Sequence, residues 1–161
     1  MLGRNLCQKI SRNFSLAALF LLLVASPAFV AAAQEGMERV GEYEIYYNVL
    51  PTSFLNPQVA QGYGVVRSKG QGMVRVTVLH RLADGSSEPV KARVSGHAGN
   101  LAGQLNGLSF HTHQVGQDNG YFNLATFRFA HDDPMRFNLR VTYNSKQPAH
   151  ELSFIRRLYM D

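Results

Sequence analysis

Apolar side chains recur at every second position in several short stretches, and this spacing constrains the fold more than any other feature. Successive side chains of a β-strand point to opposite faces, so a period of two predicts strands with one buried face. The clearest case is 135–143, and the same alternation recurs over 43–49, 74–79 and 90–95. The stretch 121–129 is apolar on both faces, which predicts a central strand that is covered on both sides.

Turn-forming dipeptides and tripeptides separate these stretches, and they define the fold class. Asp84-Gly85-Ser86 and Asp118-Asn119-Gly120 are two of them. The chain offers one short helix, with Asn56 as its N-cap and Pro57 as its first residue. Weaker strand candidates lie at 108–115 and 151–159. We therefore expect an all-β fold, an antiparallel β-sandwich of about seven strands, with a small closed barrel as the alternative. A parallel α/β fold is excluded because no segment could form the crossover helices.

The first 33 residues have the pattern of a secretion signal. A positive start is followed by the apolar run 16–24 and then by Ala31-Ala32-Ala33, which predicts cleavage after Ala33. The domains expected are a signal peptide over 1–33, a flexible lead-in over 34–41 and a single β-sandwich domain over 42–161. The predicted location is the periplasm, with no stable membrane span once the signal is removed. The alternative is an uncleaved membrane anchor, which would leave the domain on the same side.

Cysteine content and charge exclude several classes of protein. Cys7 is the single cysteine and lies in the predicted signal, so the mature chain has no disulfide, no thiol nucleophile and no thiolate metal site. Without its first 33 residues the chain keeps 13 of its 16 basic residues against 11 acidic ones. This balance gives no support to nucleic-acid binding.

Two motifs carry a resemblance to a known bacterial family. The first is Ser53-Phe54-Leu55-Asn56-Pro57-Gln58-Val59-Ala60 followed by the stretch 63–69, and the second is Gly96-x-Ala98-x-Asn100-Leu101-x-Gly103-Gln104. With Gly41-x-Tyr43 and the stretch 154–159, the sequence resembles the exported proteobacterial domain-of-unknown-function family numbered 4426. The resemblance implies an exported, immunoglobulin-like β domain, and it implies no activity.

Basic residues supply the first candidate binding sites. Arg67 and Lys69 lie beside Tyr63 in a glycine-bounded loop, where two cations are suited to a carboxylate or a phosphate. The alternative is that this loop only connects two strands. If 73–81 and 90–96 form a hairpin, Arg75 and Arg93 share an outward basic face with Arg81 and Lys91. Such a face would suit an anionic component of the cell envelope or an acidic protein patch, or would only keep the sheet soluble.

A pair of histidines supplies the candidate metal site. His111 and His113 emerge on one face of a predicted strand, close enough for two imidazoles to bind one ion. Nitrogen and oxygen ligands favour zinc or copper. A third ligand would have to come from His131, Asp132, His97 or His150. The alternative is that both histidines are solvated and bind nothing.

No segment of the chain has the pattern of a catalytic site. Adjacent carboxylates at Asp132-Asp133 lie on a turn and point apart, and no nucleophile motif is present. We therefore expect a non-enzymatic periplasmic binding or interaction module without a required cofactor. Its partner is an unknown envelope protein or an anionic envelope component. The alternatives are a carrier or sensor of a small ligand or metal, and, third, a hydrolase or other enzyme with no nucleophile to name.

Overall fold

The structure is a computed structural model that describes residues 35–116 and 120–160. Every described element belongs to one compact unit, Ala32–Asp161. The predicted signal peptide and its cleavage site lie outside the described residues. Within the described ranges, no helix has the length and hydropathy needed to cross a bilayer.

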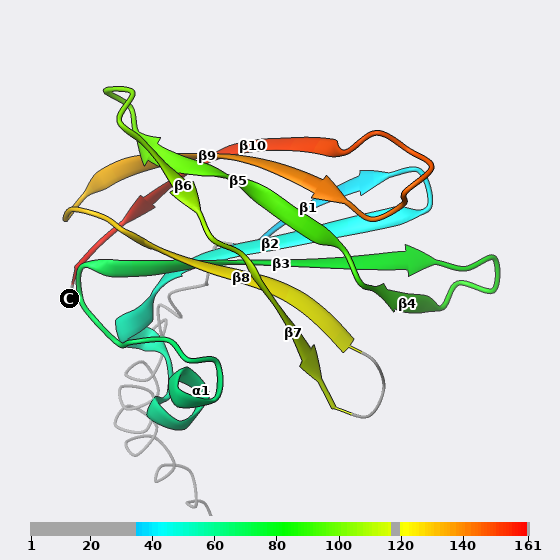
Figure 1. Cartoon of the computed structure of the whole chain (residues 1–161), viewed down its shortest axis with the longest axis horizontal. Helices are drawn as coiled ribbons and strands as arrows, with labels where there is room; N and C mark the ends of the chain where they lie inside the picture. The colour runs from blue at the N-terminus through cyan, green and yellow to red at the C-terminus, as the bar shows by residue number, and fades with distance from the viewer. Residues whose placement is uncertain (1–34, 117–119, 161) are drawn as a thin grey trace, which may run out of the picture. The chain divides into compact units, whose positions relative to one another are not determined.

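The described strands form two antiparallel sheets that pack face to face (Figure 1). The first, sheet A, has the order β1-β2-β3-β8-β7, and β4 also pairs with β3. The second, sheet B, has the order β10-β9-β5-β6. The strands of sheet A are β1 (Glu35–Val40), β2 (Tyr43–Pro51), β3 (Gln71–Arg81), β4 (Ser87–Val90), β7 (His111–Val115) and β8 (Gly120–Arg128). Those of sheet B are β5 (Arg93–Asn100), β6 (Leu105–Leu108), β9 (Asp133–Thr142) and β10 (His150–Leu158).

The strand order is that of the immunoglobulin fold, as expected. When β2, β3, β5, β7, β8, β9 and β10 are lettered A to G along the chain, sheet A has the order A-B-E-D and sheet B the order G-F-C. The strand β6 extends sheet B beyond C, and β1 and β4 are additions to sheet A. The β-sandwich is confirmed and the closed barrel is wrong. The expected number of about seven strands was low, because β1, β4 and β6 are short or polar and show no alternation.

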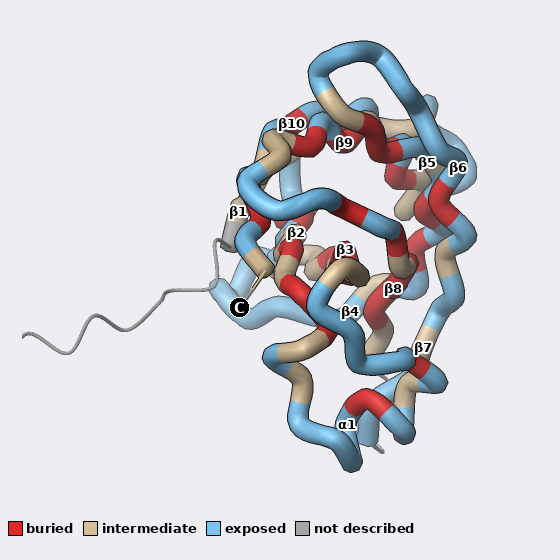
Figure 2. The backbone as a smooth tube through the Cα atoms, turned by 90° about the vertical axis from the view of Figure 1, so that its left-hand side faces the viewer, coloured by how far each residue is buried: buried red, intermediate tan, exposed pale blue. Residues whose placement is uncertain are grey.

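The main core fills the space between the two sheets. Phe137 of β9 is fully buried, with its ring stacked on Phe154 at 5.0 Å and edge-on to Phe127 at 5.0 Å. Val74, Val76 and Val78 of β3 belong to the same core and line it from the side of sheet A. Figure 2 shows buried residues on strands of both sheets, whereas β4 is almost entirely exposed. The apolar face predicted for 135–143 is therefore the face that packs in the core.

A second, smaller core lies on the other side of sheet A. Phe122 and Leu124 of β8 are buried there with Met73 and Val65. The β2–β3 connection covers them, with the 3-10 helix η1 (Thr52–Phe54) and the helix α1 (Pro57–Gly62), on the side of sheet A away from sheet B (Figure 1). The strand β8 is thus buried on both faces, as its sequence predicted.

The lead-in expected to be flexible is a strand over residues 35–40. The strand β1 pairs with β2 from Glu35↔Asn48 to Val40↔Tyr43. It escaped prediction because an edge strand buries little surface and keeps a polar sequence.

The hairpin expected between 73–81 and 90–96 is also wrong. The strand β4 pairs with β3, and the chain then crosses at Lys91 and Ala92 into sheet B, where β5 begins. Arg75 and Arg93 therefore lie on different sheets and share no basic face. Alternation predicts which face of a strand is buried, but it does not identify the neighbouring strand.

Candidate binding face on the outer side of sheet A

Polar side chains of β2 and β3 line a depression on sheet A. The register pairs Tyr46 with Thr77 and Asn48 with Arg75, which places these side chains in neighbouring rows across the two strands. They surround a cavity of about 280 Å³ that Leu79, Gly36 and Tyr47 complete. We use the term outer face for the surface of sheet A that points away from sheet B. It includes this cavity and the outward side chains of β3, β7 and β8.

An aromatic and cationic cluster adjoins the depression and is centred on Phe122. The guanidinium carbon of Arg75 lies 4.5 Å from the centre of the Phe122 ring. The His113 ring stacks on Phe122 at 5.1 Å, and Tyr63 meets Phe122 edge-on at 5.1 Å and His113 at 5.4 Å. Three predicted site residues, Tyr63, Arg75 and His113, therefore come together around a phenylalanine that sequence reasoning did not single out.

Arg75 is the chemically available group of this cluster. Its side chain is exposed, and within the described part of the chain no carboxylate lies at ion-pair distance from it. A cation held over a ring at an exposed site gains about 0.5–1 kcal/mol, so Phe122 orients the guanidinium without neutralising it. The N–H groups that do not face the ring remain able to donate to an anion.

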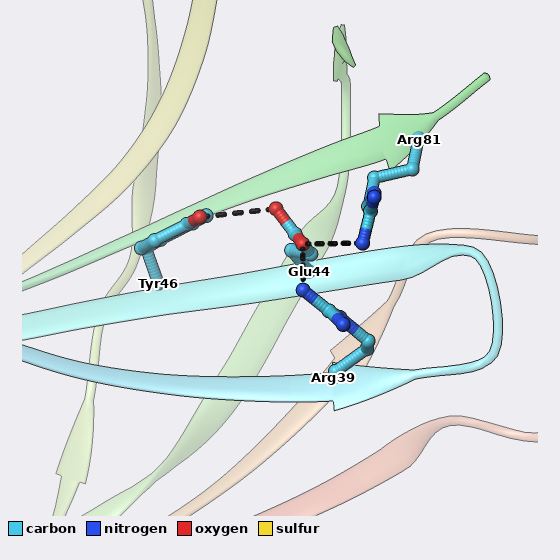
Figure 3. A network of polar contacts seen from close by, with 4 residues as sticks. All are labelled: Arg39, Glu44, Tyr46 and Arg81. Atoms are coloured by element: carbon cyan, nitrogen blue, oxygen red, sulfur yellow. Dashed lines mark hydrogen bonds and ion pairs between the residues drawn. The ribbon is translucent and has the colours of Figure 1, made fainter. Parts of the chain in front are cut away.

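A carboxylate network lies at the other end of the same strands (Figure 3). Arg39 donates to Glu44 Oε1 at 2.7 Å, Tyr46 donates its hydroxyl proton to Oε2 at 3.0 Å, and Arg81 approaches Oε1 at 3.7 Å. The hydrogen bonds from Arg39 and Tyr46 lower the pKa of Glu44, and the Glu44 carboxylate raises the pKa of Tyr46. Because Arg39 is on β1 and Arg81 ends β3, one buried carboxylate ties three strands together.

Replacement of Glu44 by Gln should make the free energy of unfolding less dependent on pH in the acid range. A carboxyl with a lowered pKa in the folded state contributes stability above its unfolded pKa, and this contribution is lost as the pH falls through the folded value. We therefore expect Glu44→Gln to be less stable than the wild type at pH 7, with a difference that shrinks below the ordinary pKa of 4.5. Urea midpoints measured from pH 7 to pH 3 test this. Glu151→Gln, at an exposed carboxylate 3.8 Å from Arg140, is the control, and a constant gap for Glu44→Gln would contradict the prediction.

Comparison with known proteins gives the family. The model for the domain of unknown function DUF4426 matches residues 37–161. The chain belongs to the DUF4426 family. A DUF4426 family protein from Pseudomonas aeruginosa PAO1 has a solved structure with 33% sequence identity, a TM-score of 0.66, and coverage of 79% of this chain and 96% of that one.

More distant structures share the fold of the DUF4426 domain. FetP from uropathogenic Escherichia coli strain F11 is 12% identical, with a TM-score of 0.57 and coverage of 78% of this chain and 93% of its own. A copper-bound variant of FetP gives a TM-score of 0.51 at 12% identity, with coverage of 76% and 93%. At this identity the likeness shows the fold alone. No curated protein matches the chain significantly.

The first family motif of the DUF4426 domain builds the β2–β3 connection. Asn56 accepts a hydrogen bond from the Gln58 amide at 2.9 Å and caps α1, as predicted. The hydroxyl of the buried Thr52 bonds the amide of Ser68 at 2.9 Å and its carbonyl at 3.3 Å. Arg67 donates to the carbonyl of Ser53 at 2.9 Å. Arg67 is therefore tied to the loop backbone.

The two cations of this loop, Arg67 and Lys69, are not part of the Phe122 cluster. Lys69 is exposed and has no ion-pair partner among the described residues. Tyr63, at the end of α1, is the residue of the predicted loop site that reaches the outer face. The loop thus contributes one aromatic side chain to the face and uses Arg67 for its own structure.

The second family motif builds the β5–β6 turn of the DUF4426 domain. The Asn100 side chain donates to Gln104 Oε1 at 2.9 Å and accepts from the Gln104 amide at 3.1 Å. Gly103 has a φ of +88°, which a turn residue without Cβ adopts at low cost. Local structure explains the turn residues Asn100, Gly103 and Gln104 of this motif.

The two predicted metal ligands lie on the same face of β7. His111 pairs with Leu124 and His113 with Phe122 across β8. His131 accepts a hydrogen bond from the Met160 amide, and His150 pairs with Glu38 at 3.1 Å. In the described part of the chain no three His, Cys, Asp or Glu side chains are grouped to hold a metal ion.

Proposed function

We propose that this DUF4426 domain is a non-enzymatic binding module of the bacterial envelope. It is exported to the periplasm by the signal in residues 1–33 and binds an anionic envelope component through the outer face of sheet A. One observation carries the proposal: Arg75 is held on Phe122 without a carboxylate partner among the described residues, beside a cavity of about 280 Å³. A cation, an amide and hydroxyl groups around a shallow cavity are suited to a charged, hydrogen-bonding ligand.

The chemistry of the face supports binding rather than proton transfer. Glu44 is held by Arg39 and Tyr46, and its lowered pKa keeps it ionised at neutral pH. A catalytic acid or base needs a pKa near the working pH, and these contacts move Glu44 away from it. His113 is packed against Phe122 and Tyr63, which orients its ring within the cluster.

Thermal unfolding of the Gln34–Asp161 domain with a ligand panel tests the proposal. The panel contains peptidoglycan fragments, lipopolysaccharide fragments, acidic peptides and neutral analogues of each. A ligand at a hundred times its Kd stabilises by about 2.7 kcal/mol, which raises the Tm by several degrees in a domain of this size. We expect an anionic ligand to raise the Tm of the wild type and to have at least tenfold lower affinity for Arg75→Gln.

Arg140→Gln is the matched control for Arg75→Gln. Arg140 is also an exposed strand arginine, but it belongs to sheet B. Equal loss of affinity in both variants would indicate a general charge effect and contradict a site at Arg75. Binding that is unchanged in Arg75→Gln would contradict it as well.

A second candidate function is a metal carrier or sensor that uses His111 and His113. Two observations favour it: both histidines lie on the outer face of sheet A, and the fold is shared with FetP, of which a copper-bound variant has been solved. Untagged protein dialysed against zinc or copper(II) should then retain about one ion per chain, and His111→Ala with His113→Ala should retain none. Equal metal content in the two proteins would contradict this function.

A further inference from the structure

The strand β5 has an edge that its neighbour only partly covers. The strand β6 pairs with β5 from Gly96↔Leu108 to Gly99↔Leu105, and the chain then leaves sheet B to form β7 in sheet A. The preceding residues of β5, from Arg93 to Ser95, have β9 on one side and no β6 partner on the other. A cavity of about 410 Å³ lies at this uncovered edge. Its lining residues are Lys91, Ala92, Arg93, Val94, Phe110, Thr112 and Asn123, which together we name the inter-sheet cleft.

The lining shows that the cleft follows a strand edge rather than a strand face. Arg93 and Val94 are consecutive residues of β5, so their side chains point to opposite faces of the strand, yet both residues line the cleft. Lys91 and Ala92, in the crossover from sheet A, continue the same lining. A cavity can contact side chains of both faces of a strand only when it lies along the edge of that strand. The cleft therefore exposes main-chain groups of β5 as well as side chains.

Asn123 lies at the end of this edge, next to the start of β5. Its side chain is 3% exposed and donates to the Ala92 carbonyl at 3.1 Å, in the crossover segment just before β5. The Thr112 hydroxyl donates to Asn123 Oδ1 at 2.8 Å and fixes the amide. In an antiparallel sheet, residues two apart direct their N–H and C=O groups to the same side. Successive residues of β5 over 93–95 therefore alternate between bonding to β9 and facing away from it, so this stretch directs N–H and C=O groups toward the position of the absent strand.

Cations and an aromatic ring surround this edge. Lys91 and Arg93 are exposed, and neither has a carboxylate at ion-pair distance among the residues described. The Lys91 ammonium lies 5.8 Å from the centre of the Tyr121 ring, on the strand that carries Asn123. Phe110 is half-buried and supplies apolar surface. The cleft thus combines a main-chain donor and acceptor, two cations and an apolar wall.

We propose that the inter-sheet cleft binds the C-terminal carboxylate of an extended peptide. The last peptide residues pair with the uncovered stretch 93–95 of β5 as a short additional strand, and the carboxylate is held by Lys91 and Arg93. Strand addition supplies main-chain hydrogen bonds, and the cations select a free C-terminus over an internal segment. This site is separate from the outer face of sheet A, and its occupation does not depend on the function proposed there.

The test compares two chemical forms of the same peptides by NMR of the ¹⁵N-labelled Gln34–Asp161 domain. One sample receives a mixture of random tetrapeptides with free C-termini, and the other receives the same mixture as C-terminal amides. We expect the amide signals of Val94, Thr112 and Asn123 to shift with the free acids and at least tenfold less with the amides. Equal shifts with both forms, or none with either, would overturn the proposal.

Variants separate the cleft from general charge effects. Arg93→Gln should weaken binding of the free acids at least tenfold, whereas Arg140→Gln, on the same sheet, should leave it unchanged. Acetate alone should shift these signals far less than the peptides, and an equal shift would overturn the strand-addition part. Arg75→Gln should leave the peptide shifts intact, so failure of the outer-face proposal and failure of this one are distinguishable.

Discussion

Phe137→Ala should lower the free energy of unfolding by about 3–5 kcal/mol, the range for truncation of a buried phenylalanine. Phe137 is fully buried at the centre of the sandwich, where its ring contacts Phe154 and Phe127. These two neighbours belong to two other strands, β10 and β8, so the lost volume cannot be refilled by movement of one element. Urea denaturation at pH 7, monitored by tyrosine fluorescence and far-UV circular dichroism, measures the loss.

Arg136→Ala is the control for this variant. Arg136 is the preceding residue of β9 and its side chain is exposed on the opposite face. Surface substitutions of this kind change stability by about 0.5 kcal/mol or less. An unchanged stability of Phe137→Ala would show that the two faces of β9 are reversed.

Gly96→Ala should destabilise the domain by about 2–4 kcal/mol, from backbone strain and overpacking together. Gly96 has a φ of +154°, and a Cβ at this position would collide with the backbone carbonyl oxygen of Asn138. Its backbone crosses close to β9, and the neighbour is main chain that cannot rotate away. The thermal midpoint and the urea midpoint should both fall.

Gly107→Ala provides the matched comparison. Gly107 lies on β6, next to the partner of Gly96, and a Cβ there would meet no atom within 4 Å. We expect stability within about 0.5 kcal/mol of the wild type. If Gly96→Ala were as stable as Gly107→Ala, close approach of β9 would not be the reason for a glycine at 96.

The outer face shows how far sequence reasoning reached toward the site. Tyr63, Arg75 and His113 were selected for three separate reasons, and in the structure they contact one ring or each other. The sequence pattern places Phe122 only within a strand that is apolar on both faces. Its central position could not be predicted, because it depends on β3 and β7 flanking β8, and strand order is a property of the whole fold.

Glu44 shows the same limit for electrostatics. Alternation placed it on the polar face of its strand, where a carboxylate is ordinarily solvated. Its partners Arg39 and Arg81 come from β1, which was expected to be flexible, and from the end of β3. A network around a buried carboxylate follows from strand register, and single-strand patterns carry no register information.

The sequence by itself determined the class of fold, the strand faces and the local caps. Period-two alternation follows from the geometry of a single strand, and the contacts of Asn56 with Gln58 and of Asn100 with Gln104 span only a few residues. The tertiary structure alone decided that β3 and β5 belong to different sheets, that β1 is a strand, and that Asn123 bonds Ala92 at the crossover into β5. These outcomes depend on pairings between residues far apart in the chain, whose energies come from the assembled sheets and not from any local segment.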